Sequence, residues 1–364
     1  MPLYNAAQHF FVERVTKIKR YDHIFEKIAT FDNLYTAYRL AIKGKRFKPE
    51  PLKITASLES SLLNICTDLW TDSFTPQPCH EFELRTEIKR RIVNAPSFRD
   101  CIVQHAIILQ TEYMFDKKMI FDSYANRKGK GTHRAVKRMQ QYLRKMPPRA
   151  YVLQGDIRHY FPSISHDILK KDLERTIADP KLLNLWSKII DSYNKTTGTG
   201  IPIGAPLSQL EAGIYLTPLD HFVKETLKEP CYLRLMDDFI IISSDKEKLA
   251  ARLAAIKTFL ENSRKLSLNR KTKIYPARCG VDFAGYRTWK THILPRKRNL
   301  EAAKRRFKEM SWLYRHGKIE LSDIQSRVAS FAGYVKHCNA RKSADSVMKR
   351  LTLTGKNERY PPTQ

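Results

Sequence analysis

Two aspartates between two short apolar runs constrain the fold of this chain more than any other feature. The run Cys231–Leu233 precedes the pair Asp237-Asp238, and the run Phe239–Ile242 follows it. Both runs have the length and the β-rich composition of strands, so they predict a tight hairpin with two carboxylates at its tip. Aspartate is also common in turns for local reasons, so the pair alone leaves a plain turn and a metal site as alternatives.

A third aspartate favours the metal site. Asp156 follows the apolar run Tyr151–Gln154, so we expect it at the end of a neighbouring strand. Three carboxylates this close repel one another unless cations neutralise them, and carboxylate oxygens are preferred ligands of Mg²⁺. Asp156, Asp237 and Asp238 therefore predict a site for two Mg²⁺ ions roughly 3.5–4 Å apart. Such a site suits nucleotidyl transfer.

The charge of the chain predicts a polyanionic partner. Its 364 residues include 66 Lys and Arg against 37 Asp and Glu, which gives a formal net charge of +29. Nucleic acid is the usual partner of so basic a protein. Basic residues occur along the whole sequence, as in Lys89–Arg91, Arg127–Lys128 and Lys304–Arg306, which indicates a long lined channel. A cationic ribosome-like or membrane-surface protein is the alternative, but it would not need an acidic cluster.

Cysteine usage and hydropathy favour a reduced, cytoplasmic protein. The six cysteines show no C-x-x-C spacing, so we expect neither a zinc site nor a disulfide framework. Residues 1–11 are apolar but lack the basic region and cleavage site of a signal peptide. No window approaches 18 uninterrupted apolar residues, so we expect no membrane contact.

Apolar periodicity predicts an α+β fold. Steps of three and four residues predict helices within residues 1–80 and again from Arg296 onward. The basic stretch Lys43–Pro51 is expected to be a loop, and alternation within residues 82–96 predicts a strand pair. Pro218 is expected to kink or shorten the helix in which it lies.

Two glycine-containing loops each lead into a helix. Tyr124–His133 is basic and suits a polyphosphate, because backbone amides at a helix N-terminus would lie beside its cationic side chains. A simple solvated loop is the alternative. Ile201–Gln209 contains both glycine and proline and precedes the second helix.

The order of these motifs resembles that of reverse transcriptases, most closely those of bacterial diversity-generating retroelements. The resemblance covers roughly residues 30–345. The matching segments are two fingers motifs, Arg91–Gln104 and Ser123–His133, the first catalytic palm motif, Gly155–Phe161, and the primer-grip turn, Phe283–Tyr286. The resemblance implies a right-hand polymerase fold with fingers, a helical thumb, and a palm in which helices cover one face of an antiparallel sheet.

The resemblance also implies domain boundaries. They are an N-terminal helical extension (1–80), fingers (81–150), palm (151–290), helical thumb (291–354) and a flexible tail (355–364).

Individual residues receive roles from the same resemblance. Asp156, Asp237 and Asp238 would be catalytic and, with Ile157, would hold two Mg²⁺ ions, for which Mn²⁺ can substitute. Phe161 would block a ribose 2′-hydroxyl, or would be a buried aromatic of the palm. The residues assigned to the incoming nucleotide are Arg91, Arg127, Phe161, Ile203, Gly204 and Gln209. Those assigned to template or primer are Lys128, Lys130, Leu235, Gly285, Tyr286, Lys304 and Arg305.

Two positions bear on the subgroup. Ile203–Gln209 resembles the form found in error-prone diversity-generating enzymes, where Ile203 replaces a glutamine. Isoleucine cannot hydrogen-bond to the nucleotide or template, and one such bond is worth about 1 kcal/mol of discrimination. Packing of the loop alone is the other interpretation of Ile203. Leu235 stands where the family usually has tyrosine, which leaves room for the related antiphage-defence enzymes.

The resemblance therefore implies an RNA-directed DNA polymerase. It would copy a dedicated noncoding RNA into cDNA from a DNA primer, using dNTPs, with an accessory protein as a further partner. The first hypothesis is error-prone synthesis in a diversity-generating retroelement. DNA synthesis from a noncoding RNA in antiphage defence is the alternative. A catalytically silent RNA-binding module agrees less well, because all three aspartates are present.

Overall fold

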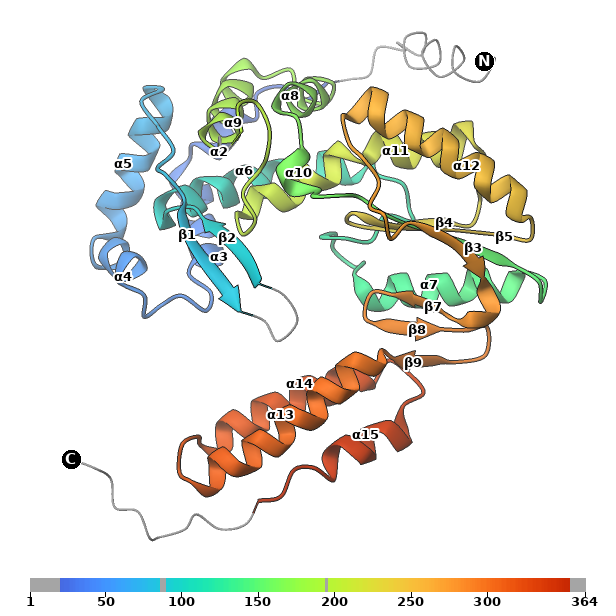
Figure 1. Cartoon of the computed structure of the whole chain (residues 1–364). Coiled ribbons are helices and arrows are strands. Elements are labelled where there is room, and N and C mark those ends of the chain that lie inside the picture. Colours follow the sequence, from blue (N-terminus) through green and yellow to red (C-terminus); the bar gives the residue numbers. More distant parts are fainter. Residues whose placement is uncertain (1–19, 86–89, 194–195, 354–364) are drawn as a thin grey trace. The chain divides into compact units, whose positions relative to one another are not determined.

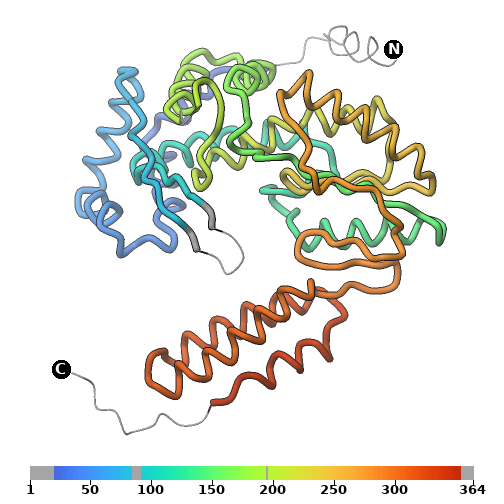
Figure 2. The backbone as a smooth tube through the Cα atoms, viewed as in Figure 1, coloured from blue at the N-terminus to red at the C-terminus, as the bar shows by residue number. Residues whose placement is uncertain are grey.

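The computed structural model of the protein describes residues 20–85, 90–193 and 196–353. The start of the expected N-terminal extension and the expected tail 355–364 lie outside these residues. Figure 1 shows the helices and strands, and Figure 2 traces the backbone alone. The chain divides into two compact units: Met1–Gly129, Gln154–Ile241 and Ala250–Lys273 form one, and Lys130–Leu153, Ile242–Leu249 and Ile274–Gln364 form the other. The domain boundaries implied by the sequence stay predictions.

Helices form the N-terminal part of the first unit. They are α2 (Phe25–Ile28), α3 (Phe31–Ala41), α4 (Pro49–Ala56), α5 (Leu58–Trp70) and α6 (Phe98–Asp116). Two side chains accept hydrogen bonds at the start of α6. The Ser97 hydroxyl accepts from the Asp100 amide at 3.0 Å, and Glu50 accepts from the Phe98 amide at 2.8 Å. Such acceptors satisfy amides that have no partner within the helix.

The expected loop Lys43–Pro51 is shorter than the sequence indicated. Its proline pair starts a helix, since α4 begins at Pro49. Proline suits the first turn of a helix, where its missing N–H has no intrahelical role.

The strands of the described residues form three sheets. β1 (His80–Arg85) and β2 (Arg90–Ala95) pair antiparallel, as the sequence predicted. The strand order of the second sheet is β4-β5-β3-β6, with β3 at Tyr151–Asp156, β4 at Tyr232–Leu235, β5 at Asp238–Ser243 and β6 at Lys273–Pro276. The third sheet contains β7 (Val281–Phe283), β8 (Tyr286–Thr288) and β9 (Ile293–Pro295).

The remaining helices of the chain are mostly amphipathic. In chain order they are α7 (Thr132–Lys145), α8 (His166–Glu174), α9 (Pro180–Ser192), α10 (Pro206–Tyr215), α11 (Thr217–His221), α12 (Lys246–Phe259), α13 (Lys297–Arg315), α14 (Leu321–Val335) and α15 (Arg341–Met348). Short 3₁₀ turns lie at Phe161–Ser163 and Ala277–Cys279, and π-helical turns at Phe222–Thr226 and Leu260–Arg264. The expected break near Pro218 is present, because α10 ends at Tyr215 and Pro218 lies in the first turn of α11.

The second unit has its own cores. Phe307, Met310, Ile324, Phe331 and Val347 pack α13, α14 and α15 together, and Figure 1 shows these three helices side by side. Val136 of α7 packs against Tyr286 and Ile293 of the third sheet. The mixture of helices with antiparallel strand pairs confirms the α+β class. Among the described residues, no helix is long and apolar enough to cross a membrane.

The core of the first unit contains an ionisable side chain. Glu211 of α10 is 2% exposed, and its carboxylate accepts a hydrogen bond from the Trp186 indole of α9 at 2.8 Å. Burial raises the pKa of Glu211 from 4.5 to about 7, because a charged carboxylate loses its hydration there.

This shift predicts how stability depends on pH. A raised pKa in the folded state means that the folded protein binds the proton more tightly, so the contribution to stability is complete below pH 4.5 and is lost as pH rises through about 7. We expect Glu211→Gln to unfold at a higher temperature than the parent at alkaline pH and at a similar temperature in acid. Thermal unfolding followed by circular dichroism across this range checks it. A difference in unfolding temperature between the two chains that is the same at every pH would contradict the raised pKa of Glu211.

Candidate active site

The aspartate pair lies in a tight hairpin between β4 and β5. Leu235 pairs with Asp238 across the hairpin, so Met236 and Asp237 form a two-residue turn. Met236 has φ of 60°, a left-handed conformation that glycine adopts more readily than methionine. The turn therefore holds backbone strain that surrounding contacts must offset.

A buried ion pair supports this turn from inside the protein. Arg234 and Asp220 are both 0% exposed. The Arg234 Nε and Nη2 donate to the two carboxylate oxygens of Asp220 at 2.7 and 2.6 Å, and its Nη1 donates to the Met236 carbonyl at 2.9 Å. The Tyr232 hydroxyl also donates to Asp220 at 2.6 Å. The guanidinium thus connects the core directly to the strained residue of the turn.

A second segment lies along the outer side of β4. The Arg234 amide donates to the Asp122 carbonyl, and the Tyr124 amide donates to the Arg234 carbonyl, both at 2.9 Å. Lys224 pairs with the buried Asp122 carboxylate at 3.1 Å. The start of the predicted motif Ser123–His133 is therefore fixed beside the aspartate hairpin.

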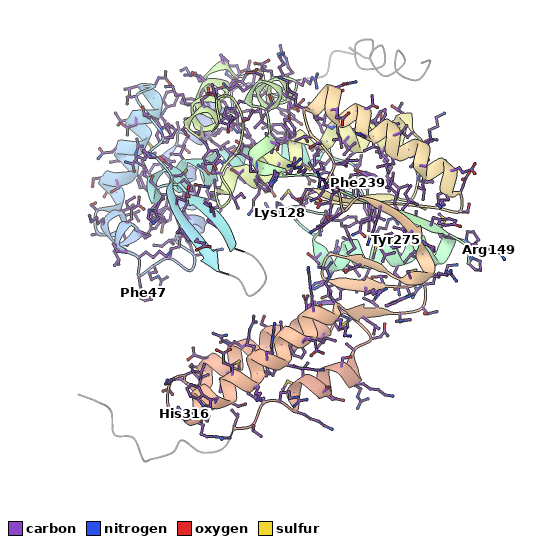
Figure 3. All side chains as sticks on the ribbon, in the orientation of Figure 1. Phe47, Lys128, Arg149, Phe239, Tyr275 and His316 are labelled. Carbon is purple, nitrogen blue, oxygen red and sulfur yellow. The ribbon has the colours of Figure 1, made fainter. Side chains whose placement is uncertain are left out.

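Asp156 is the last residue of β3, the strand that lies next to β5 in the sheet. A Cβ on Gly155 would lie 2.1 Å from Cζ of Phe239, so only glycine leaves room for that buried ring, which Figure 3 labels. Gly155 precedes Asp156 and Phe239 follows Asp238, so this contact holds the two aspartate backbones near each other. On the other side of β3, the Asn269 amide donates to the Asp156 carbonyl at 2.7 Å.

The donor set suits a hard divalent cation. Asp156, Asp237 and Asp238 are half-buried, and carboxylate oxygens are preferred ligands of Mg²⁺. Within the part of the chain that the structure describes, no three His, Cys, Asp or Glu side chains form a cluster arranged for a metal ion. Ile157 is buried beside Asp156. The assignment of these residues as metal ligands stays a prediction.

The loop that contains Ile203 packs against strand β2. The Asn94 amide of β2 donates to the Ile203 carbonyl at 2.9 Å. Gly204 has φ of +115°, and a Cβ there would lie 2.7 Å from Cγ1 of Val93. Ile203 is half-buried, so part of its side chain remains accessible. The structure thereby joins two segments that the sequence assigned separately to the nucleotide.

The other residues assigned to the nucleotide differ in exposure. Phe161 is half-buried and Gln209 is exposed, so neither is a fully buried core residue. Arg127 is only 9% exposed, and its guanidinium donates to Asp116 and to the Ile120 and Ser123 carbonyls. These bonds give Arg127 a structural role in its loop, and its contact with a triphosphate stays a prediction. The side chain of Arg91 lies outside the described residues.

The residues assigned to template or primer belong to both units. In the first unit, Figure 3 labels Lys128, which is 89% exposed and pairs with Glu112 at 3.3 Å. Leu235 is half-buried. In the second, Arg305 is exposed, Lys304 pairs with Glu301 at 3.0 Å, and Lys130 lies just before α7.

The predicted primer-grip turn is present in the second unit. Ala284 and Gly285 connect β7 to β8, and both have positive φ, as a tight hairpin turn requires. Tyr286 is only 1% exposed, and its hydroxyl donates to the Tyr334 carbonyl at 2.9 Å. Its side chain is therefore part of the core, and the contact of Tyr286 with template or primer stays a prediction.

Sequence reasoning missed Asp220 and gave Arg234 no role. The signal was a charged residue within the strand Tyr232–Leu235, where neighbouring side chains are apolar. A buried guanidinium needs a carboxylate partner, but the sequence alone did not identify which aspartate supplies it.

Comparisons with known proteins match more than half of the chain to one family. The family model described as reverse transcriptase (RNA-dependent DNA polymerase) matches residues 85–288, more than half of the chain. Protein YkfC of Escherichia coli K12 is 25% identical over 276 residues, which cover 64% of this chain and 72% of YkfC. The group II intron-encoded protein LtrA of Lactococcus lactis is 27% identical over 230 residues, 58% of this chain and 38% of LtrA.

A solved telomerase from Candida albicans, in complex with a fragment of telomeric RNA, aligns with a TM-score of 0.46 and 11% identity. The alignment covers 77% of this chain and 56% of the telomerase chain.

The chain belongs to the reverse transcriptase family. Its enzyme class is therefore RNA-directed DNA polymerase, which copies an RNA template. The bacterial reverse transcriptase resemblance of the sequence is confirmed.

The contact between Gly155 and Phe239 can be tested by adding one methyl group. Gly155→Ala places a Cβ inside the Phe239 ring volume, so we expect a loss of about 1–3 kcal/mol in unfolding free energy. Phe239→Leu in the same chain should recover part of it. Gly333→Ala is the control, because a Cβ at that helical position meets nothing within 4 Å. Urea denaturation measures all four chains; a Gly155→Ala variant as stable as the parent would contradict the packing.

Proposed function

We propose that this enzyme copies RNA into cDNA with Asp156, Asp237 and Asp238 as its catalytic carboxylates. One observation carries the proposal: the close approach of Gly155 to Phe239, which brings the end of β3 to the start of β5. The three aspartates then share one edge of the sheet. Membership of the reverse transcriptase family supplies the reaction class.

The aspartates would hold two Mg²⁺ ions, with the backbone of Ile157 as a further candidate ligand. When bound, such ions supply positive charge to the reacting phosphate and lower the pKa of an attacking hydroxyl. The protein contributes the rigid placement of the carboxylates. Arg234 holds the carbonyl of Met236, and the Asn269 amide holds the carbonyl of Asp156, so two of the flanking peptides are fixed before substrate arrives.

The nucleotide would meet Phe161 and the loop of Ile203 and Gly204. Phe161 is half-buried with its ring edge-on to Tyr160 at 5.7 Å between centroids, which supports a fixed steric wall against a ribose 2′-hydroxyl. Gly204 permits the loop to lie against β2, the strand that contains Arg91. This packing supports a nucleotide site formed by the loop and the strand together.

Error-prone copying in a diversity-generating retroelement is the biological role we propose. Its support is Ile203, a half-buried aliphatic side chain that offers the nucleotide no hydrogen bond. An absent hydrogen bond weakens discrimination by about 1 kcal/mol, several-fold in selectivity. Leu235, half-buried opposite Asp238, supports the second candidate, antiphage defence by DNA synthesis on a noncoding RNA, because it replaces the tyrosine usual at this position.

Primer extension on an RNA template tests the proposal. With a DNA primer, dNTPs and Mg²⁺, we expect the parent chain to synthesise cDNA and the Asp237→Ala plus Asp238→Ala variant to make none. The control, Asp32→Ala plus Asp345→Ala, removes the same charge from two exposed aspartates and should extend normally.

The products distinguish the outcomes. Extension by the Asp237→Ala plus Asp238→Ala variant would overturn the catalytic assignment. Sequencing of the cDNA separates the roles, because errors concentrated at template adenines support diversification. Faithful or repetitive copies of a fixed RNA support defence.

A further inference from the structure

The three-stranded sheet of the second unit has one buried and one open face. Along β7, β8 and β9, alternate residues point into the core, and they are Val281, Phe283, Tyr286, Thr288 and Ile293. The residues between them lie on the other face in register, with Asp282 opposite Arg287 and Arg287 opposite Leu294. One acidic and one basic side chain therefore lie on neighbouring strands of the open face.

A cavity of about 390 Å³ lies on this open face. Its walls are Asp282, Arg287, Trp289, Leu294, Pro295, Arg296, Lys297 and Arg298. Ligand sites usually measure roughly 300–1,000 Å³, so the cavity is large enough for a single nucleotide. Four cationic side chains face one carboxylate.

Only one of these cations is neutralised by the carboxylate. Arg296 pairs with Asp282. Arg287 donates through Nε and Nη2 to the Cys279 carbonyl at 3.0 and 2.6 Å, a neutral acceptor that orients the guanidinium and leaves its charge. Lys297 and Arg298 are exposed and form no ion pair with any carboxylate among the described residues. The cavity therefore keeps an excess of positive charge.

The position of these cations is unfavourable for the helix itself. Arg296, Lys297 and Arg298 form the N-cap and the first two positions of α13, a helix of 19 residues with no acidic side chain in its first turn. The N-terminus of a helix carries partial positive charge and favours anions. Positive side chains at this end of the helix therefore cost stability. Such a local cost is expected at a functional site, where a bound ligand offsets it.

The aromatic wall of the cavity is rigid. The Trp289 indole donates to the Arg278 carbonyl at 3.2 Å, and a Cβ on Gly280 would lie 2.4 Å from its ring. The guanidinium carbon of Arg287 lies 5.4 Å from the ring centre. The same ring stacks on His292 with centroids 4.6 Å apart, so Trp289 contributes a fixed wall beside guanidinium groups, which bind phosphate well.

We propose that this cavity binds a nucleotide of single-stranded RNA, with its phosphate held by Arg287, Lys297 and Arg298. The inference rests on the proposed use of an RNA template. The site consists only of residues of the second unit, so it is an RNA contact additional to the aspartate hairpin. Asp282 would weaken the site by neutralising Arg296.

Binding of a labelled, unstructured poly(U) RNA, followed by fluorescence anisotropy at several salt concentrations, tests this site. We expect Lys297→Ala plus Arg298→Ala to reduce the magnitude of the slope of log affinity against log salt by about 0.7, since the cavity holds one phosphate and each phosphate contact on a single strand contributes about 0.7. Arg341→Ala plus Lys342→Ala is the matched control. It removes the same two charges from exposed side chains that start another helix, α15, and should leave the slope nearly unchanged.

A gain of affinity completes the test. Asp282→Asn should strengthen RNA binding, because it frees the charge of Arg296, and a purely structural role of Asp282 would not produce that result. Equal slopes of log affinity against log salt in the two double variants would overturn the proposal that this cavity binds RNA. Displacement of poly(U) by uridine monophosphate at equal phosphate concentration would overturn the assignment to a strand. The measurement uses a metal chelator and no dNTPs, so it is independent of whether the chain polymerises DNA.

Discussion

The buried ion pair between Arg234 and Asp220 is the interaction on which the rest of the candidate active site depends. Removing two charges from water costs several kcal/mol, and good geometry with further hydrogen bonds is needed to offset it. Here the guanidinium meets the carboxylate through two parallel hydrogen bonds, the strongest arrangement for this pair. Its third bond goes to Met236, so the same group that satisfies the buried carboxylate also fixes the aspartate turn.

Rigid placement of the aspartates follows from several such constraints at one sheet edge. The strained backbone of Met236 persists because both strands of its hairpin are fixed by pairing and by buried side chains. Gly155 allows Phe239 to lie against β3, which fixes the spacing between two strands. Because preorganised groups need no rearrangement when charge develops, this rigidity suits a reaction that depends on positioned carboxylates.

Local sequence patterns predicted much of this architecture, whereas contacts between residues distant in the sequence could not be predicted. The aspartate hairpin, the strand pair in residues 82–96 and the break at Pro218 follow from neighbouring residues, so the sequence was sufficient for them. The partner of Arg234 lies fourteen positions earlier and beyond a π-helical turn, where no periodic pattern connects the two.

The burial and pairing of other assigned residues could not be predicted from the sequence, because both are properties of the fold. Arg127 occurs in a basic loop and was assigned to phosphate, yet its donors go to protein carbonyls and to Asp116. Tyr286 was assigned to nucleic acid, yet strand alternation turns its ring into the core. Proline was interpreted as a loop signal at Pro49, where it instead begins a helix.

Replacing the buried side chains of Arg234, Asp220 and Tyr232 by apolar ones tests whether this network is needed to position the aspartate turn. Arg234→Met alone should cost about 3–5 kcal/mol of unfolding free energy, because it leaves a buried charge unpaired. Adding Asp220→Leu and Tyr232→Phe should restore most of that stability. We expect the rate of primer extension to stay low in the restored chain, since the Met236 carbonyl has lost its donor. Recovery of the rate together with stability would contradict it.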